Sequence, residues 1–379
     1  MSSTESPTAA VGVTGGSGFL GWHTSCRLLS LGVAVRLITR PMAVTGPNNA
    51  ADGLGAVIHL AGVNRGTDDE IRDGNREACD QLIDAIRNAE RPPTRVVYAD
   101  SIQSSNDSVY GLAKREVGDR LRAFCDASAI TYSGVRIPNV FGEGGRPFYN
   151  SFVATFCHQI AHGETPTIQT DREVPLVHAQ EVADALAHAA LGNVVGVAPL
   201  APTVTSVREV LRKLTAMHAT YADSARIPRL ESAFETNLFN TLRSSIYTKY
   251  GPTQPLKLNT DQRGWLVETV KAETGGQVFV SSTVPGVTRG QHYHLRKLER
   301  FVVLQGTAEI CMRRLFSGDV QRFAVTGAQP MAVEIPTLHT HQITNTGTDL
   351  VLTLFWSNEI FDPNRPDTYA LSVYDGNDR

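Results

Sequence analysis

The sequence has few cysteines, no long apolar run and no marked excess of either charge. Its five cysteines are odd in number and lack CxxC spacing, which argues against disulfides and a thiolate zinc site and indicates a reducing compartment. No segment approaches the roughly 18 consecutive apolar residues of a membrane span, and residues 1–10 lack the basic start and apolar core of a signal peptide. With a net charge of −3 and no long basic run, nothing favours nucleic acid as a partner. We therefore expect a cytoplasmic protein that binds neither membranes nor nucleic acid.

The 379 residues exceed what one hydrophobic core usually serves, so we expect two domains. A hydrophobic content of 41% and a charged content of 19% are ordinary for a globular protein. Helical spacing is frequent in the earlier part, whereas the last part alternates short β-branched strands with turns. We predict a disordered lead at residues 1–10 and an α/β domain at residues 11–245. A linker at residues 246–255 then leads to an all-β barrel or jelly roll at residues 256–379.

The first motif is a strand, a glycine-rich turn and a helix between residues 10 and 32. Gly15, Gly18 and Gly21 give the spacing GxxGxxG. Such glycines permit the turn, let a pyrophosphate approach the backbone and allow close helix packing, while the helix N-terminus faces the phosphates. An ordinary glycine-rich turn is the alternative. We expect a dinucleotide here, bound by Gly15, Ser17, Gly18, Phe19, Leu20 and Gly21.

The next predicted strand, VAVRLITR, ends at Arg40, about 20 residues beyond the glycines. An acidic residue at this place would bond the ribose 2′-hydroxyl of NAD, whereas an arginine suits the 2′-phosphate of NADP. We therefore expect NADP(H), with a solvated residue closing a strand as the alternative. Only a short connection separates this strand from the following one, GAVIHLAGVNR, so we expect a sheet that lacks part of a normal doubly wound half.

The chemistry of this domain is predicted in RVVYADSIQSSNDSVYGLAKREVGDRL, residues 95–121. Ser101 ends a predicted buried strand, and Tyr110 and Lys114 share one face of the helix that follows because they are four residues apart. A free tyrosine titrates near pH 10, and a lysine cation beside it favours the phenolate. Ser101 would hold the substrate oxygen. The YxxxK pattern indicates a catalytic pair here because it follows the glycine motif, with a strand that ends in serine between the two.

Residues 11 to about 245 resemble an extended short-chain dehydrogenase/reductase with a Rossmann-like fold, of the branch that works on nucleotide-activated sugars. TGGSGFLG, HLAGVNR, YGLAK and RIPNVFG stand at that family's places. The resemblance implies a sugar-nucleotide contact at Asn139. It implies that the catalytic residues are Ser101, Tyr110 and Lys114, and that the cofactor is also contacted by Leu60, Ala61, Gly62, Tyr110 and Lys114.

Arginines and an asparagine near the middle of the chain are candidates for the substrate's diphosphate or uracil. Arg146 and Asn150 lie in GGRPFYNSF, and polar loop residues without a ligand are the alternative. Many family members have an arginine four residues before a VHVDDV-like segment, but here that place is Val174, and Arg172 is offset by two. The sequence leaves open which arginine meets the diphosphate.

A histidine cluster lies in GVTRGQHYHLRKLERFVVLQG, residues 286–306. Two histidines one residue apart on a predicted strand point to the same face, into the barrel, because side chains alternate along a strand. A glutamate begins the next strand and a third histidine lies on a later one. Imidazoles and a carboxylate suit Zn, Fe, Mn or Ni, whereas a lone histidine is more often a core residue. We expect one divalent ion, with zinc as the first choice, on His292, His294, Glu299 and His341.

This pattern is similar to that of the cupin superfamily, whose motif G(X)5HXH(X)4E(X)6G is met in full from Gly286 to Gly306. The second cupin motif, PxGxxHxxxN, is met at Pro336, His341 and Asn345. Leu338 replaces the glycine of that motif. His339 shares a face with His341 and competes as a ligand, although the motif position favours His341. The resemblance implies that the C-terminal domain is a cupin jelly-roll barrel.

A nucleotide-sugar reductase joined to a metal-binding cupin resembles the CapF-type family of bifunctional capsular-polysaccharide enzymes, over nearly the whole chain. The resemblance implies that the cupin epimerises C3 of a UDP-2-acetamido-2,6-dideoxy-4-hexulose. The reductase then reduces the C4 ketone with NADPH, giving a UDP-N-acetyl-L-talosamine-type product on the way to UDP-N-acetyl-L-fucosamine. A divalent metal can stabilise the enolate formed when the α proton leaves, and His339 and Tyr293 are candidate bases. We also expect a homodimer.

Other functions fit parts of the sequence. The metal could be purely structural, and the protein could be a plain 4-ketosugar reductase whose cupin serves oligomerisation or regulation. A redox-sensing NADP-binding scaffold is a third interpretation. The intact set of Ser101, Tyr110 and Lys114 argues against it, because a sensor has no use for a proton relay.

Overall fold

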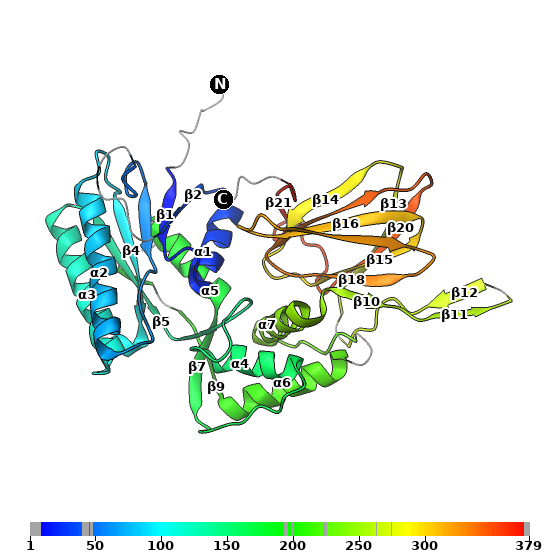
Figure 1. Ribbon diagram of the computed structural model, residues 1–379, viewed down its shortest axis with the longest axis horizontal. Coiled ribbons are helices and arrows are strands. Elements are labelled where there is room, and N and C mark those ends of the chain that lie inside the picture. The colour runs from blue at the N-terminus through cyan, green and yellow to red at the C-terminus, as the bar shows by residue number, and fades with distance from the viewer. Residues whose placement is uncertain are drawn as a thin grey trace. The chain divides into compact units, whose positions relative to one another are not determined.

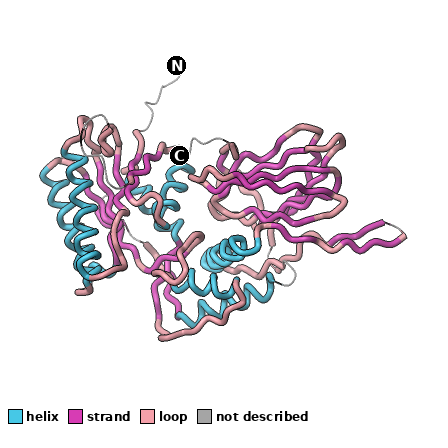
Figure 2. The backbone as a smooth tube through the Cα atoms, in the orientation of Figure 1, coloured by secondary structure: helices cyan, strands magenta, loops and turns pink. Residues whose placement is uncertain are grey.

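The computed structural model describes residues 9–39, 45, 48–192, 196–198, 200–222, 226–262, 264–273 and 275–374. The chain forms two compact units, Met1–Phe141 with Val174–Val204 and Gly142–Glu173 with Thr205–Arg379. The first contains a parallel sheet with helices, and the second contains helices and then a run of β-strands (Figures 1 and 2). Within the described residues, no helix has the length and apolar character that a membrane crossing needs.

The first unit is built on a parallel sheet of order β2-β1-β3-β4-β5-β8. Its strands are β1 (Val11–Thr14), β2 (Val35–Ile38), β3 (Ala56–His59), β4 (Arg95–Ser101), β5 (Thr131–Ile137) and β8 (Gly196–Ala198). Parallel strands covered on both faces are apolar throughout rather than alternating. Accordingly, every residue of β1 and β3 is buried. This confirms the predicted Rossmann-like α/β architecture.

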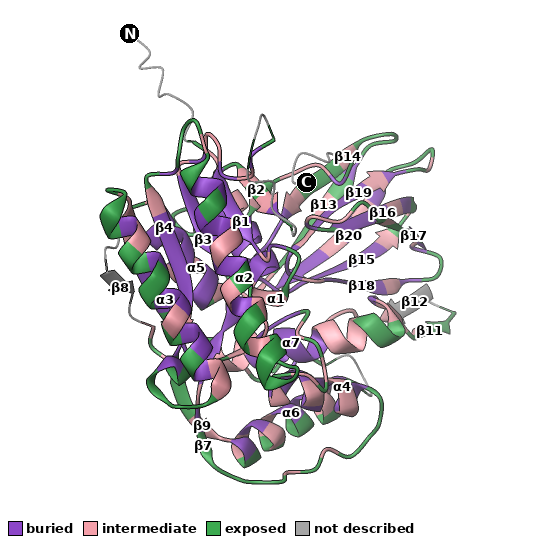
Figure 3. Ribbon diagram, turned by 60° about the vertical axis from the view of Figure 1, so that its left-hand side comes forward, coloured by how far each residue is buried: buried purple, intermediate pink, exposed green. Residues whose placement is uncertain are grey.

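Helices cover both faces of this sheet. α1 (Phe19–Ser30) and α5 (Ala179–Ala190) pack together over one face, and α2 (Asp68–Arg87) and α3 (Val109–Ala127) pack together over the other. Each pair closes its own apolar core against the strands. Figure 3 shows the buried strands β1, β3 and β4 in purple beside these helices. The two cores hold the carboxyl ends of the strands, and the loops that follow them, in fixed positions.

The predicted shortening of the sheet is present. β2 leads to β3 with no helix or strand among the described residues of the connection, and β2 lies at the edge of the sheet. In the common doubly wound order 3-2-1-4-5-6, a third strand lies beyond the second. Arg40, the residue predicted to select NADP, falls in this connection and lies outside the described residues.

Three helices and a small sheet follow. The helices α4 (Phe152–Ala161), α6 (Val207–Ala222) and α7 (Ala233–Tyr250) pack against one another. The small sheet has the order β6-β7-β9 and is made of Asn139–Phe141, Glu173–His178 and Thr203–Ser206.

The C-terminal part of the second unit is all β, and we call the residues from β10 to β21 the β-domain. Two antiparallel five-stranded sheets have the orders β10-β18-β15-β20-β13 and β17-β16-β19-β14-β21, and β11 and β12 form a separate hairpin. One apolar core draws on strands of both sheets, so the sheets face each other. The strands are β10 (Thr253–Pro255), β11 (Leu258–Asp261), β12 (Gly264–Val267), β13 (Gln277–Thr283), β14 (Thr288–Tyr293), β15 (Glu299–Gln305), β16 (Thr307–Arg314), β17 (Val320–Thr326), β18 (Met331–Ile335), β19 (His339–Asn345), β20 (Val351–Ser357) and β21 (Tyr369–Ala370). A C-terminal all-β domain is thereby confirmed.

The stretch predicted as a linker, residues 246–255, has regular structure. Helix α7 continues to Tyr250, and Gly251 ends it with a φ of 77°. Strand β10 then pairs with β18 of the β-domain. Gly251, Pro252 and Pro255 in this stretch therefore mark a helix end and an edge strand, where glycine and proline are common.

A buried group of three charged side chains joins α7 to the β-domain. Arg243 of α7 donates to Glu334 of β18 at 2.9 Å, and Arg300 of β15 donates to the other carboxylate oxygen at 2.7 Å. Their exposed fractions are 7%, 5% and 1% for Arg243, Glu334 and Arg300. A buried charge that loses its partner is costly, so these contacts hold α7 against the β-domain. Both belong to the second compact unit.

Candidate active sites

The turn between β1 and α1 lets other groups approach the backbone closely. Gly15 has a φ of 67°, and a Cβ atom on it would lie 2.9 Å from the amide nitrogen of Ala61. A Cβ on Gly21 would lie 2.2 Å from the carbonyl oxygen of Gly15. The N-cap of α1 is Gly18, which offers no side-chain cap, and the first helical turn has no acidic residue. The first N–H groups of the helix are therefore suited to an anion, and these residues fit a dinucleotide pyrophosphate.

The other predicted cofactor residues lie around the same turn. The hydroxyl of Thr14, the last residue of β1, accepts the amide N–H groups of Leu60 and Ala61, each at 3.1 Å. Gly62 leaves room for Asn75, because a Cβ there would lie 2.5 Å from the amide oxygen of Asn75. The remaining turn positions are exposed or half-buried: Ser17, Phe19 and Leu20. The ends of β1 and β3 thus form one edge, where parallel sheets bind ligands.

The predicted catalytic residues come from β4 and α3. Ser101 ends β4, and its hydroxyl accepts the N–H of Gln103 at 3.1 Å in the short 3-10 turn Ile102–Ser105. Tyr110 is half-buried in the first turn of α3, and Lys114 is buried one turn later. Helix α3 packs on both β4 and the 3-10 turn. The end of β4 lies at the same sheet edge as the glycine turn, so this arrangement can bring a proton relay to a bound cofactor.

Lys114 has an unusual environment for an ammonium group. Its Nζ donates to the carbonyl oxygen of Ala99 at 2.6 Å. Burial lowers the pKa of Lys114 from 10.5 to about 8, with the charge of Asp100 opposing the shift. A lysine that titrates near the working pH is typical of catalytic sites.

The predicted substrate residues lie on the surface. Asn139 begins β6 in the first unit, is exposed, and donates its amide N–H to the carbonyl oxygen of Pro175 at 3.1 Å. Arg146 and Asn150 are exposed residues of the second unit. The guanidinium of Arg146 lies 5.0 Å from the centroid of the Tyr149 ring. All three side chains are accessible to a ligand.

The two arginine positions that the sequence leaves open differ in exposure. Val174 is buried at 2% exposure on β7, whereas Arg172 is exposed just before that strand. The backbone oxygen of Arg172 accepts the N–H of Val207, which fixes the main chain and leaves the side chain at the surface. Of these two positions, Arg172 is the one that presents a cation to solvent.

The four predicted metal ligands lie together in the β-domain. One ligand atom from each of His292, His294, Glu299 and His341 falls within 4.8 Å of all the others. Glu299 Oε2 lies 3.0 Å from His294 Nε2 and 3.5 Å from His341 Nε2. Neither of these buried nitrogens has a hydrogen-bond partner among the described residues. Buried imidazole nitrogens that converge on a carboxylate fit a divalent ion such as zinc.

In two of the ligands, the ring nitrogen that faces away from the cluster, Nδ1, forms a hydrogen bond with a backbone oxygen. His294 Nδ1 donates to the backbone oxygen of Asp367 at 2.5 Å, and His341 Nδ1 donates to the backbone oxygen of His339 at 3.3 Å. A carbonyl oxygen can only accept, so the proton lies on Nδ1 and the Nε2 lone pair faces the cluster. This is the usual way in which proteins orient histidine ligands.

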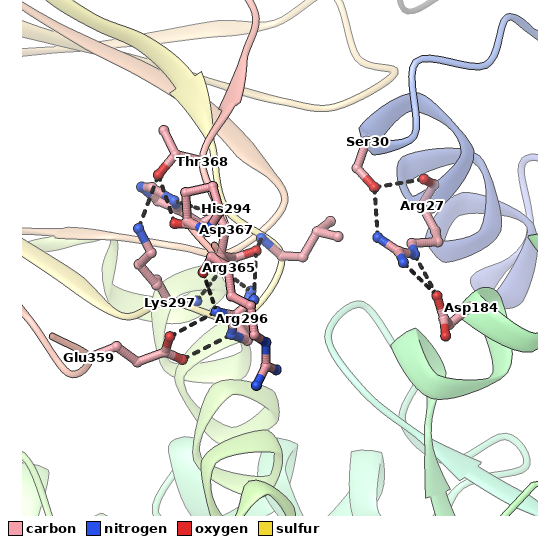
Figure 4. Close-up of polar contacts among 12 residues, drawn as sticks. Arg27, Ser30, Asp184, His294, Arg296, Lys297, Glu359, Arg365, Asp367 and Thr368 are labelled. Atoms are coloured by element: carbon pink, nitrogen blue, oxygen red, sulfur yellow. Dashed lines mark hydrogen bonds and ion pairs between the residues drawn. The ribbon is translucent and has the colours of Figure 1, made fainter. Parts of the chain in front are cut away.

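Asp367 holds the loop that carries His294 (Figure 4). Its carboxylate accepts three consecutive backbone N–H groups at 2.9–3.1 Å, those of Leu295, Arg296 and Lys297. Asp367 is 2% exposed and has a φ of 45°. The sequence motifs do not mark this residue, because it lies far from the histidines along the chain and contributes mainly through its backbone oxygen and these backbone contacts.

The ionisation of the cluster suits metal binding. Burial opposes the charge of Glu299, but the favourable interactions with the neighbouring rings of His294 and His341 outweigh it and hold the pKa of Glu299 well below its ordinary value. Burial, followed by the effect of the neighbouring histidines, lowers the pKa of His292 to about 3. At neutral pH the carboxylate is therefore charged and His292 is neutral, as metal ligands must be.

Irregular backbone shapes the ligand positions. The pairing of β14 with β19 shifts between Gly290 and His292, and Gln291 has a φ of 60°. Such a bulge redirects the side chains that follow it. Leu338 stands where the second motif has glycine, yet it keeps the left-handed turn with a φ of 62°. It is fully buried, and its N–H donates to the backbone oxygen of His294 at 2.7 Å.

The comparisons identify relatives along both parts of the chain. The model of the NAD dependent epimerase/dehydratase family matches residues 11–199, and that of the polysaccharide biosynthesis C-terminal domain matches residues 259–369. A UDP-2-acetamido-2,6-beta-L-arabino-hexul-4-ose reductase of Pseudomonas aeruginosa is 33% identical over 370 residues, which cover 96% of this chain and 99% of that protein. The chain belongs to the CapF-like family of UDP-4-keto-sugar reductases.

Solved structures support this CapF-like assignment. The capsular polysaccharide assembling protein CapF of Staphylococcus aureus is 28% identical with a TM-score of 0.57, over 96% of this chain and 100% of that one. A UDP-N-acetylglucosamine 4-epimerase of Bacillus cereus shares the fold over 64% of this chain and 97% of its own, with a TM-score of 0.52 at 17% identity. The CapF-like chain is thus an enzyme of a nicotinamide-dependent family with a C-terminal all-β domain.

In this CapF-like chain the two candidate bases lie on different faces of their sheet. His339 is two residues before His341 on β19 and therefore shares its face. Its Nδ1 donates to the backbone oxygen of Thr337 at 2.8 Å, and burial lowers the pKa of His339 to about 4. The hydroxyl of Thr337 donates in turn to the buried carboxylate of Glu143 at 2.9 Å. Sequence motifs do not predict the contact with Glu143, which is distant along the chain.

Tyr293 has a different environment. It is the last residue of β14 and follows His292 directly, so its side chain points to the opposite face from that of His292. It is buried at 1% exposure, and its ring stacks on Tyr369 of β21 with centroids 5.2 Å apart. This geometry favours His339 over Tyr293 as a group that faces the cluster.

Proposed function

We propose that this CapF-like enzyme carries two activities, one in each compact unit. The β-domain, which we assign to the cupin superfamily, inverts C3 of a UDP-2-acetamido-2,6-dideoxy-4-hexulose, and the first unit reduces the C4 ketone with NADPH. The observation that carries the proposal is that Tyr110 and the four-ligand cluster lie in separate units. A proton relay and a metal site are different catalytic devices, and a single ketone reduction needs only the first.

In the reductase site, the residues at the sheet edge have distinct roles. When bound, NADPH supplies the hydride. Tyr110 donates its hydroxyl proton to the C4 oxygen as that oxygen gains charge, and Ser101 holds the same oxygen by a hydrogen bond. The buried cation of Lys114 favours the loss of that proton from Tyr110. We assign NADP rather than NAD because Arg40 stands where a 2′-phosphate is recognised.

In the β-domain, His292, His294, Glu299 and His341 hold the metal, with zinc as the first choice. A divalent ion at this place would supply Lewis acidity toward the substrate's ketone oxygen, and a proton on the carbon next to the ketone would then be easier to remove.

We assign the removal of the C3 proton to His339. Its Nδ1 proton is engaged by Thr337, which leaves the Nε2 lone pair as the proton acceptor. The lowered pKa of His339 keeps the ring neutral at physiological pH. The side chain also shares a face with His341, as a base acting beside the metal requires.

Deuterium exchange tests the proposal. The zinc-loaded full-length enzyme is incubated in D2O with a UDP-2-acetamido-2,6-dideoxy-4-hexulose and no NADPH, and the sugar is examined by mass spectrometry and NMR. We expect one deuteron at C3, because only an epimerase exchanges that proton. The same experiment with NADPH added reports reduction.

The alternative is a monofunctional reductase with a structural or regulatory β-domain. A folded, zinc-loaded enzyme that reduces the ketone but exchanges no C3 proton would establish this alternative and remove the epimerase half of the proposal. A panel of UDP- and dTDP-linked 4-keto sugars in the same assay identifies the nucleotide and sugar that the enzyme uses.

A further inference from the structure

A line of buried side chains connects the glycine turn to Lys114 through the interior of the first unit. Thr14 of β1 and His59 of β3 share a hydrogen bond of 2.9 Å between Oγ1 and Nδ1. The His59 ring stacks on Tyr98 of β4, with centroids 6.1 Å apart and an angle of 25° between the planes. The Nζ of Lys114 lies 4.5 Å from the centroid of the Tyr98 ring. All four side chains are buried.

Tyr98 contacts Lys114 at both ends of the lysine. Its ring face receives the ammonium, and its hydroxyl donates to the backbone oxygen of Lys114 at 3.1 Å. Ala99 provides the carbonyl oxygen that accepts from Nζ. Lys114 forms no ion pair within the described part of the chain, although its ammonium is buried. A buried ammonium needs electrostatic compensation, and here one carbonyl oxygen, one aromatic face and the nearby charge of Asp100 provide it.

An aromatic face differs from a carboxylate as a partner for this lysine. A carboxylate would bind the ammonium protons in fixed directions, whereas a ring stabilises the charge without accepting a directed hydrogen bond from each proton. In the described residues, the oxygen of Ala99 is the one hydrogen-bond acceptor of Nζ. The remaining N–H groups stay available for the reacting tyrosine and for a cofactor.

We propose that Tyr98 is a positioning residue of the reductase site, which holds the Lys114 ammonium on its ring face and so keeps that cation charged and in place beside Tyr110. The inference rests on the proposed reductase function of Ser101, Tyr110 and Lys114. Through His59 and Thr14, the same line of side chains fixes the ring relative to the glycine turn. The lysine is thus placed with respect to the cofactor site.

Other titratable groups surround the pair and must be separated from the effect of the ring. The groups that act on Tyr98 come from four different elements: Asp100, Tyr110, Tyr132 and Cys79. Tyr132 is a matched control, because it is an aromatic residue of the neighbouring strand β5 and its ring receives Arg122 rather than Lys114.

The experiment compares Tyr98→Leu, Tyr98→Phe and Tyr132→Leu in the full-length enzyme. The dissociation constant of NADPH is measured by fluorescence titration at several pH values on both sides of the pKa of Lys114. The reductase kcat and KM are measured at the same pH values. NADPH binding needs no sugar, so this readout does not depend on the identity of the substrate.

We expect Tyr98→Leu to move the alkaline weakening of NADPH binding to lower pH by about one unit, since the lost cation–π contact stabilises the charged lysine. The reductase kcat should fall more than the KM for the sugar changes. Tyr98→Phe should keep the wild-type profile because it keeps the ring, and Tyr132→Leu should keep it as well. If the leucine variant does not fold, Tyr98→Met gives the same comparison with a side chain that adapts to irregular space.

A folded Tyr98→Leu or Tyr98→Met enzyme with the wild-type pH profile and kcat would overturn the inference. Equal losses in Tyr98→Phe and Tyr98→Leu would also overturn it, because the hydroxyl and not the ring would then be responsible. Tyr110→Phe distinguishes this outcome from failure of the proposed function. If Tyr110→Phe still oxidises NADPH at the wild-type rate, the reductase assignment itself is wrong, whatever the Tyr98 variants show.

Discussion

At the scale of single residues, Lys114 should make the stability of the enzyme depend on pH. Its pKa is about 8 in the folded protein and 10.5 ordinarily. Between these two values the unfolded chain holds a proton that the folded chain has released, so the free energy of unfolding rises with pH across this window. This contribution is lost as the pH falls through about 8.

Lys114→Met should remove that dependence, and it should stabilise the folded protein at neutral pH relative to the wild type. The difference between the two proteins should change by roughly 3 kcal/mol across the window, at about 1.4 kcal/mol per pKa unit. Urea unfolding at several pH values measures it, with the exposed Lys257→Met as the control. A wild-type-minus-variant difference that stays constant with pH would contradict the prediction.

A second prediction at this scale concerns the choice of cofactor. Arg40→Asp should weaken NADPH binding by at least about tenfold while changing NADH binding much less, because it removes the partner of the 2′-phosphate and adds repulsion. Titration of the variant with both cofactors measures the ratio of dissociation constants. An unchanged ratio would show that Arg40 does not select the cofactor.

At the scale of elements, the loop held by Asp367 controls the position of His294. Asp367→Asn keeps the size and the backbone oxygen but weakens the three charge-assisted bonds to the loop N–H groups. We expect zinc affinity to fall by about 10- to 100-fold, as is usual when a group behind a metal ligand is changed. Competition with a zinc chelator measures the affinity.

The exposed Asp362→Asn in the same C-terminal segment is the matched control for this change. It should leave zinc affinity unaltered. Equal affinities of the Asp367→Asn enzyme and the wild type would show that the backbone of the loop is held by its other contacts alone.

The elements also show what a sequence pattern can predict and what it cannot. The glycine turn, YxxxK and the HxH motif depend on local spacing, so their positions at strand ends and on one helix follow from the chain itself. The contacts of Asp367 with His294 and of Glu143 with Thr337 join residues distant along the chain, and no local period records them. Leu338 shows a third case, in which burial offsets a strained backbone that glycine would adopt freely.

At the scale of the whole molecule, the two activities should be separable by mutation. Tyr110→Phe should lower NADPH oxidation by about 100-fold or more while deuterium exchange at C3 continues, because it removes the proton donor of one unit only. Loss of both activities in this folded variant would contradict the two-site model.

The reverse result is expected for His292→Ala. Losing one of four ligands should lower the metal content and abolish C3 exchange, while reduction of an already epimerised ketone continues. Metal analysis and calorimetry check this, with the exposed His162→Ala as control. A lower melting temperature with unchanged exchange would mean that the metal is structural, and unchanged metal content, stability and exchange would remove the case for this site.

The charged contact between α7 and the β-domain limits how such an enzyme can be taken apart or recombined. A polypeptide that starts at residue 256, the predicted domain boundary, lacks β10, which is one of the two strands that pair with β18. It also lacks Arg243, so that Arg300 is the one counter-ion left to Glu334 among the described residues. Removing one partner from a buried ion pair costs about 3–5 kcal/mol. The metal-binding half can therefore be transplanted to another reductase, in the laboratory or by gene fusion, only together with the helix that precedes it.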